Sequence, residues 1–158
     1  MGRLRVIDIS DPKSMNPVNQ FTTTDFFKYA IAFERDGKSI IAALQVTSLE
    51  LFDITDPMNL RVLSILSLGE TGQYLQFSDD MQFIFAAGSS KGVYKIDISD
   101  INDIKLNLTF DSSGFEANYF SFLKNDKIFL ADEAKVSILD ISDISAPFVK
   151  GSSSTDEI

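Results

Sequence analysis

The sequence predicts an all-β protein assembled from repeats of about 44 residues, each contributing four short antiparallel strands. Three observations lead to this prediction. A phrase of about seven residues recurs four times, turn residues divide each interval into short apolar segments, and these segments carry apolar side chains on both faces. No stretch has the 3.6-residue apolar period of an amphipathic helix.

The repeated phrase combines a hydrophobic strand, an aspartate and a polar turn. Its first aspartates are separated by 45, 44 and 43 residues, so the chain repeats one structural unit at a near-constant period. The four copies are residues 6–12, 51–57, 94–100 and 138–143.

The strands within each unit follow one order. The first ends in Phe33, Phe77 or Phe122, and a turn rich in Asp, Asn or Gly leads to an Ala-rich partner in residues 39–43, 83–87 and 128–131. The phrase strand follows in residues 4–9, 49–54, 93–98 and 136–141. A further apolar segment comes after each phrase, in residues 18–23, 61–66 and 104–110, and we expect it to be an inner strand that begins the next sheet.

Apolar residues on both faces of the phrase strands require a covering layer on each side. In residues 49–54, Leu49 and Leu51 lie on one face, and Phe52 and Ile54 lie on the other. Radial stacking of equivalent four-stranded sheets meets this requirement, and such sheets with a period of about 40 to 45 residues are typical of β-propellers. A β-sandwich is the alternative fold.

The phrase and its spacing resemble the LVIVD-repeat family, whose units end in Val/Ile-Ile-Asp-Ile/Val-Ser-Asp-Pro and form propeller blades. The resemblance covers nearly the whole chain, including a tail at residues 147–156 that is similar to the innermost strand opening a next blade. It implies a propeller fold and a suspected binding role.

We expect one β-propeller segment over residues 1–158 whose ring is incomplete. Three complete blades would come from units 11–54, 55–98 and 99–141, with partial units at 1–10 and 142–158, whereas closed propellers use four to eight blades. The exposed end faces predict a segment of a larger propeller or a ring completed by a second chain.

Composition excludes several classes of function. The 158 residues carry a net charge of −9, which disfavours nucleic acid as a partner, and no apolar run approaches the roughly 20 residues that span a bilayer. The chain has no His and no Cys, which removes the Ser-His-Asp and Cys-His arrangements and imidazole or thiolate metal sites. We expect no cofactor, no metal site and no signal peptide within these residues, and the cellular compartment stays open.

The repeated aspartates are interpreted as structural. A feature present in every unit builds the unit, so we expect the phrase carboxylates to accept backbone N–H groups and the acids three residues later to stabilise turns. These two sets are Asp8, Asp53, Asp97 and Asp140, and Asp11, Asp56, Asp100 and Asp143. Tyr29, Tyr74 and Tyr119 are expected to pack between blades. The sequence Asn107-Leu108-Thr109 matches a glycosylation acceptor but falls within an expected inner strand, which disfavours a sugar.

Candidate binding residues lie in the irregular loops before the Tyr-bearing strands, because function on such a fold resides where units differ. They combine aromatic and acidic side chains suited to a basic or peptide partner, although packing of the loops on each other is the structural alternative. The candidates are Asp25, Phe26, Phe27, Glu70, Phe115 and Glu116.

These features favour a non-enzymatic module for protein–protein interaction or scaffolding, with another copy or the rest of a longer chain as partner. The alternative is a propeller that binds or hydrolyses a carbohydrate or small ligand, with catalytic acids partly outside this segment. A pair of acids about 5 to 9.5 Å apart in a polar central pocket would favour the enzyme.

Overall fold

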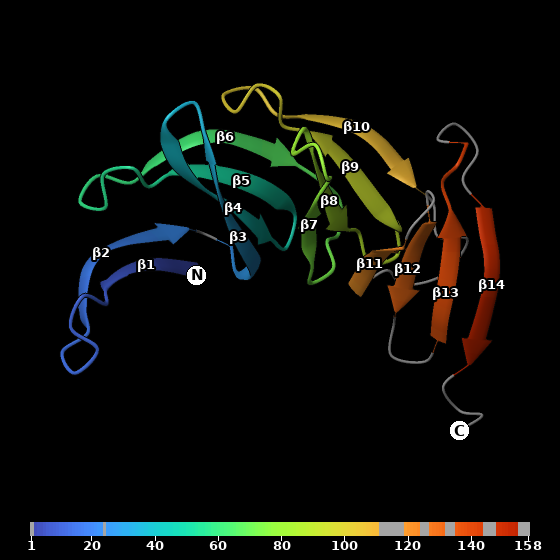
Figure 1. Ribbon diagram of the computed structural model, residues 1–158, viewed down its shortest axis with the longest axis horizontal. Coiled ribbons are helices and arrows are strands. Elements are labelled where there is room, and N and C mark those ends of the chain that lie inside the picture. The colour runs from blue at the N-terminus through green and yellow to red at the C-terminus, as the bar shows by residue number, and fades with distance from the viewer. Residues whose placement is uncertain are drawn as a thin grey trace.

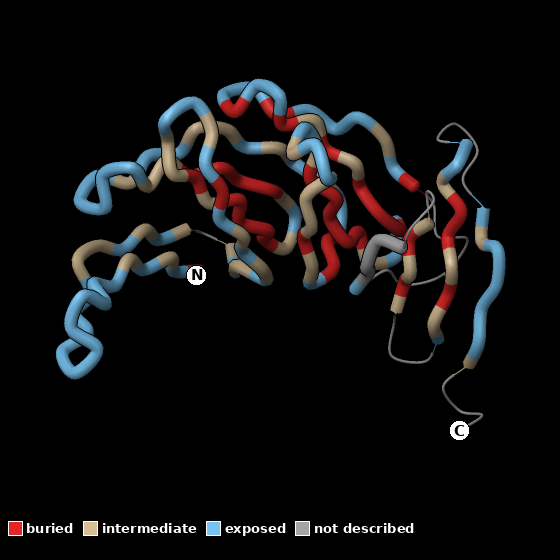
Figure 2. The backbone as a smooth tube through the Cα atoms, viewed as in Figure 1, coloured by how far each residue is buried: buried red, intermediate tan, exposed pale blue. Residues whose placement is uncertain are grey.

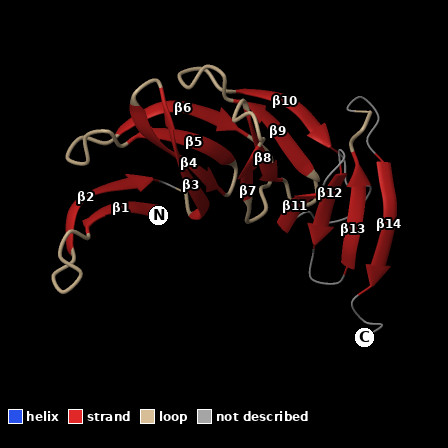
Figure 3. Cartoon of the chain, viewed as in Figure 1, coloured by secondary structure: helices blue, strands red, loops and turns tan. Residues whose placement is uncertain are grey.

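The computed structural model describes residues 2–23, 25–110, 119–123, 127–131, 135–143 and 148–154. This part of the chain consists of strands joined by turns and loops and contains no helix (Figure 3). The strands are β1 (Gly2–Asp8), β2 (Asn16–Thr23), β3 (Phe27–Arg35), β4 (Lys38–Gln45), β5 (Ser48–Asp53), β6 (Arg61–Ser67), β7 (Leu75–Phe77), β8 (Phe83–Ala87), β9 (Val93–Asp97), β10 (Lys105–Phe110), β11 (Tyr119–Leu123), β12 (Lys127–Ala131), β13 (Lys135–Asp140) and β14 (Phe148–Ser154).

Within the described residues, the strands form three four-stranded antiparallel sheets and one two-stranded sheet. The first, second and third complete blades are β3–β6, β7–β10 and β11–β14, and the half-blade is the hairpin β1–β2. In Figure 1 these sheets stack into an open arc, with β3, β7 and β11 on the concave side and β6, β10 and β14 on the convex side. The expected all-β architecture of three complete blades plus flanking strands in an incomplete ring is confirmed.

The grouping of strands into sheets differs from our expectation in one respect. The strand after each phrase is not the inner strand of the next blade, because β6, β10 and β14 pair with the phrase strands β5, β9 and β13 and form the outer edge of the same blade. The tail strand β14 therefore closes the third blade. The physical reason is the short turn after each phrase, which returns the chain antiparallel to the strand it has just left.

A β-bulge recurs at the same place in all four copies of the phrase. The pairing with the outer strand shifts between the second and first residues before the phrase aspartate, which leaves one extra residue on the outer strand. The extra residues are Val18, Leu63, Asn107 and Lys150. This shared irregularity shows that β1–β2 corresponds to the outer two strands of a blade.

The turns between the first two strands of a blade have the expected backbone conformation. Asp36 and Gly37 have φ angles of 52° and 72°, as in the two-residue hairpin turns that match strand twist, and Met81 has a φ of 58° in the corresponding turn of the second blade. The expected third turn at residues 124–126 lies outside the described residues.

Two clusters of buried residues lie at the two junctions between complete blades, and Figure 2 marks the buried residues of these blades in red. One cluster joins Ile40, Leu44 and Leu51 of the first blade to Leu75 and Ile84 of the second. The other cluster joins the second blade to the third; its buried members are Phe85, Ala87, Val93, Phe110, Ile128, Leu130 and Leu139. Since a sheet apolar on both faces is buried only between neighbours, the core of this protein is a set of blade junctions.

One arginine side chain, called here the Arg35 staple, connects the first and second blades across the first of these junctions. The Arg35 guanidinium, at the end of β3, donates hydrogen bonds to the carbonyl oxygens of Met81 and Ile98 in the second blade. It also lies over the Phe33 ring, 5.7 Å from the centroid.

In the part of the chain described here, no helix is long and apolar enough to cross a membrane.

Candidate functional site

The phrase aspartates cap the turns that follow their own strands. In each copy Oδ1 accepts the backbone N–H two residues later: Ser10 to Asp8 at 2.9 Å, Thr55 to Asp53 at 3.0 Å, Ser99 to Asp97 at 2.8 Å and Ser142 to Asp140 at 3.0 Å. Because each carboxylate is engaged at the end of a different blade, the four acids do not converge on one point. They have the geometry expected of structural residues.

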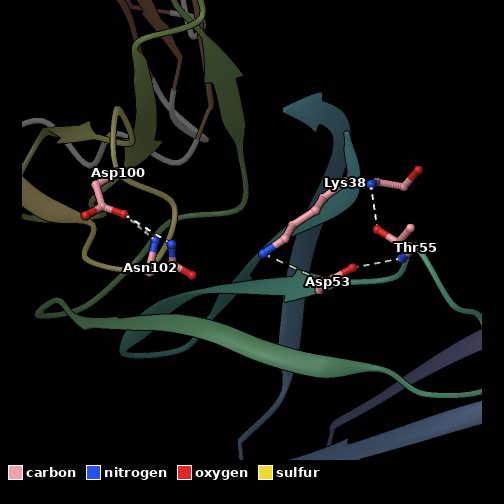
Figure 4. Close-up of polar contacts among 6 residues, drawn as sticks. Lys38, Asp53, Thr55, Asp100 and Asn102 are labelled. Atoms are coloured by element: carbon pink, nitrogen blue, oxygen red, sulfur yellow. Dashed lines mark hydrogen bonds and ion pairs between the residues drawn. The ribbon is translucent and has the colours of Figure 1, made fainter. Parts of the chain in front are cut away.

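The same contacts favour the ionised form of these carboxyl groups. The Thr55 hydroxyl and its backbone N–H lower the pKa of Asp53, burial opposes the shift, and the nearby Lys38 ammonium adds to it from 3.9 Å (Figure 4). Asp140 is buried, and the Ser142 hydroxyl and N–H lower its pKa, assisted by two lysine ammonium groups. These acids therefore act as anionic hydrogen-bond acceptors.

The acids that follow in each phrase stabilise the next turn. Asp11, Asp56 and Asp100 each accept a backbone N–H at 2.9 Å, from Lys13, Met58 and Asn102 respectively. In the third of these turns, the Asn102 side-chain amide also approaches the carboxylate (Figure 4). Short carboxylates that bond to the backbone two residues on are typical of Asx-turns.

The first candidate loop divides between exposed and packed residues. The Asp25 carboxylate accepts the Phe26 N–H at 2.8 Å, and the Phe26 side chain is 62% exposed. Phe27 instead turns toward the blade, with its ring 6.1 Å from that of Phe52. Phe26 is thus available at the surface, Asp25 is partly buried, and Phe27 packs against Phe52.

The second candidate loop lies beside the first. The Lys28 ammonium donates to the Thr71 carbonyl, next to the exposed Glu70. The Glu70 carbonyl accepts the Tyr94 hydroxyl at 3.2 Å, which ties this loop to the second blade. The two described loops therefore form one edge of the arc. Phe115 and Glu116, the remaining candidates, lie outside the described residues.

A buried glutamate near this edge escaped sequence reasoning. Glu50 is 9% exposed within the first complete blade, where burial raises its pKa, the Gln45 amide opposes that shift and the Asp25 carboxylate adds to it. It lies on the blade face that also carries Phe52. The available signal was an acid placed between Leu49 and Leu51 in the middle of the strand.

An open apolar pocket of about 360 Å³ lies between the half-blade and the turn that follows β5. Its exposed walls include Ile9 and Met58, which are 70% and 67% exposed. The equivalent isoleucine of the second blade, Ile98, is fully buried. The full lining is Val6, Ile7, Asp8, Ile9, Ser10, Val18, Pro57 and Met58.

The expected inter-blade tyrosines do connect neighbouring blades. The rings of Tyr29 and Tyr74 are 5.2 Å apart at their centroids, and the Tyr119 hydroxyl donates to Gln73 at 3.0 Å. Asn107, however, is exposed at the bulge of the outer strand β10, which corrects its expected place in an inner strand. The expected inner-strand position therefore gives no argument against modification of this asparagine.

Among the residues that the structure describes, no three His, Cys, Asp or Glu side chains gather in a way that could hold a metal ion.

Comparisons with known proteins agree with the propeller architecture. A family model for the LVIVD repeat matches residues 1–23 and 126–155. A crystal structure of a protein from Lactobacillus plantarum superposes with a TM-score of 0.71 at 13% identity, over 96% of this chain and 51% of that one. No curated protein matches the sequence.

A second solved structure is the periplasmic gluconolactonase PpgL of Pseudomonas aeruginosa, with a TM-score of 0.66 at 13% identity over 89% of this chain and 42% of that one. At such identities the similarity shows the fold alone. The chain spans about half the length of these structures. Together with the repeated phrase and its shared bulge, these comparisons show an open propeller arc with matches to the LVIVD repeat in its half-blade and its third complete blade.

Proposed function

We propose that this chain is a non-enzymatic interaction or scaffolding module, an arc of propeller blades that associates with another protein segment. That segment belongs either to a second chain or to a longer propeller. The observation that supports the proposal best is the unequal burial of one repeat position, because Ile98 is fully buried whereas Ile9 of the half-blade is 70% exposed.

The exposed position belongs to a contiguous apolar surface. Ile9, Ile7 and Met58 line the open pocket beside the half-blade, and Met15 is exposed on the same hairpin. Soluble monomers rarely leave large contiguous apolar patches uncovered, and such patches mark interfaces. The half-blade end of the arc is therefore the proposed contact surface.

The loop edge offers a second surface of different chemistry. Phe26 presents an exposed ring beside the Asp25 carboxylate, and Glu70 lies on the adjoining loop. An aromatic ring between acids suits a basic peptide, which gains cation–π and charge contacts there. Phe26, Asp25 and Glu70 remain the proposed rim residues.

The hydrogen bonds that the repeated aspartates make to their own turns support a non-enzymatic role. A carboxylate-pair hydrolase needs two acids close together with separated pKa values. Here the phrase acids each bond their own turn in a separate blade, and the pKa values of Asp8, Asp53, Asp97 and Asp140 are all lowered. Hydrolysis of a carbohydrate or lactone remains the alternative, which a lactonase assay on the purified chain would test.

Sedimentation velocity over a range of concentrations tests the interaction role. We expect reversible self-association of the chain through its uncovered apolar surface, and an Ile9→Glu, Met58→Glu double variant should weaken it at least about tenfold. Both side chains are exposed, so the variant should keep its fold, as circular dichroism would show.

Leu106→Glu, on the exposed outer strand of the second blade, is the matched control. A chain that stays monomeric and compact at every concentration, or that associates equally well in both variants, would contradict the proposal.

A further inference from the structure

We infer that the half-blade is an acceptor for a β-hairpin that supplies the two missing inner strands of that blade. The incoming hairpin would pair with the free edge of β1 and pack against the inner strands of the first complete blade. This inference rests on the proposed interaction role and names the partner. The partner at the β1 edge is a segment with an inner strand pair, whereas the self-association expected above uses the separate apolar surface around Ile9 and Met58.

The edge of β1 provides the first argument. Within the described residues β1 pairs with β2 alone, whereas β5, β9 and β13, at the same place in the repeat, each pair with strands on both sides. A strand with one unpaired edge presents a row of backbone donors and acceptors that another strand can satisfy. The repeat itself therefore shows what belongs at this edge.

The uncovered face of β3 provides the second argument. In the second blade, Leu75 and Phe77 of the inner strand point toward the first blade, and Leu75 is 2% exposed. The residues at the same pairing positions in the first blade are Ala30 and Ala32, and both are exposed. The inner half of this face is thus uncovered.

The second strands of the two blades, β8 and β4, show the same difference in burial. Ile84 of β8 is fully buried, whereas Ile41, its counterpart in β4, is only partly buried. Further along the same face, Phe52 of β5 is fully buried, and the Phe21 ring of β2 lies 5.0 Å from its ring. The half-blade therefore covers the outer half of the face, and an inner strand pair would continue that interface.

The strand composition of the complete blades identifies the segment that would complete the half-blade. Each complete blade consists of an inner pair, a phrase strand and an outer strand, and β1–β2 are the phrase and outer strands. A second copy of the described arc would bring another phrase and outer pair, while its inner strands are already paired in blades. The missing component is an inner hairpin from a further segment.

The small side chains on β3 also specify the chemistry of that hairpin. Ala30 and Ala32 leave room that large apolar side chains of the incoming strand would fill. Residues 27–45 of this chain form such a hairpin, with Ile31 and Phe33 packed in the first cluster and a two-residue turn that favours pairing. A synthetic peptide of residues 27–45 is therefore a suitable probe.

The test titrates the full chain into this labelled peptide and follows fluorescence anisotropy. We expect saturable binding at a one-to-one ratio, with slower hydrogen exchange of the β1 amides in the complex. An Ala30→Arg, Ala32→Arg variant should weaken binding at least about tenfold, because bulky charged side chains would then occupy the docking face. Both alanines are exposed, so the variant should fold normally.

Thr109→Arg, on the exposed outer strand β10, is the matched control and should bind like the unmodified chain. The inference is overturned if the peptide does not bind, if the alanine variant binds equally well, or if the β1 amides gain no protection. Self-association that persists without peptide binding would retain the interaction role and reject the hairpin. Loss of both would reject the two proposals together.

Discussion

The rings of Phe33 and Phe77 meet edge-on across the first junction, with their centroids 5.1 Å apart. The two residues lie near the ends of equivalent inner strands, yet they point toward each other. Across the strands of the first blade, Phe33 is aligned with the phrase aspartate, because it pairs with Ile40 and Ile40 pairs with Asp53. In the second blade, Phe77 is aligned instead with the residue before the phrase aspartate, because its partner Ile84 pairs with Ile96. A shift of one residue moves a side chain to the opposite face of a sheet.

Removing one ring of this pair should destabilise the stack of blades. Phe33 is buried at 7% exposure, so Phe33→Ala should cost about 3 to 5 kcal/mol of unfolding free energy through lost burial and the cavity left behind. Urea denaturation measures the loss. A double-mutant cycle with Phe77→Ala should give a coupling of about 0.5 to 1.5 kcal/mol, and strict additivity would show that the rings do not interact.

The Arg35 staple should also contribute to stability across the same junction. Arg35→Ala removes two charge-assisted hydrogen bonds to the carbonyl groups of Met81 and Ile98, for which we expect a loss of about 1.5 to 3 kcal/mol. Arg35→Lys should restore only part of it, since an ammonium group does not reproduce the planar fork. Arg3→Ala, at an exposed position of the half-blade, is the control. Equal stability of all three variants would argue against the staple.

The phrase acids should make the protein sensitive to acid. The Ser99 hydroxyl and N–H lower the pKa of Asp97, so this carboxylate stabilises the fold above its ordinary pKa of about 4, and the contribution is lost as pH falls through the lower folded value. Asp97→Asn should therefore reduce stability at pH 7 and have a shrinking effect toward pH 2. Denaturant midpoints at both pH values measure it, with the exposed turn variant Asp36→Asn as control. A loss that is the same at both pH values would refute the electrostatic explanation.

Glu50 should have the opposite pH dependence. Burial raises its pKa, so ionisation is harder in the folded state, and the resulting cost appears as pH rises above the ordinary value near 4.5. Glu50→Gln should stabilise the protein at pH 7, and the gain should vanish below about pH 4. Asp25→Asn should give a smaller gain of the same sign at neutral pH. A Glu50→Gln variant that is destabilised at pH 7 would indicate that the charged form makes a favourable contact.

Local information predicted the blades well. The phrase and its 43- to 45-residue spacing predicted four-stranded repeats, and the Asp36-Gly37 turn has the expected positive φ angles. The aspartates were also predictable, because an Asx-type contact two residues away depends only on the local chain. These features all depend on interactions within a few residues.

The candidate site was predictable only in part. Phe26 and Glu70 are exposed as their irregular loops suggested, but Asp25 is partly buried and Phe27 packs against Phe52. Neither the Arg35 staple nor the burial of Glu50 follows from local sequence, because both depend on which blade face meets which neighbour. The prediction that the strand after each phrase begins the next blade was wrong for a related reason. The alternation of apolar residues along a strand is the same whichever sheet the strand joins.

The sequence by itself determined the repeat, its four strands and the capped turn that ends each phrase strand. The tertiary structure decided how the strands divide among sheets and which faces are covered. Ile40 and Ile84 stand at the same distance before their phrase aspartates, but Ile40 pairs with Asp53 whereas Ile84 pairs with Ile96, so the pairing of the second blade is shifted by one residue. Side chains alternate between the two faces of a sheet with a period of two, so this shift turns Phe77 toward Phe33. Such a choice of face is a property of packed blades, and no window of local sequence contains it.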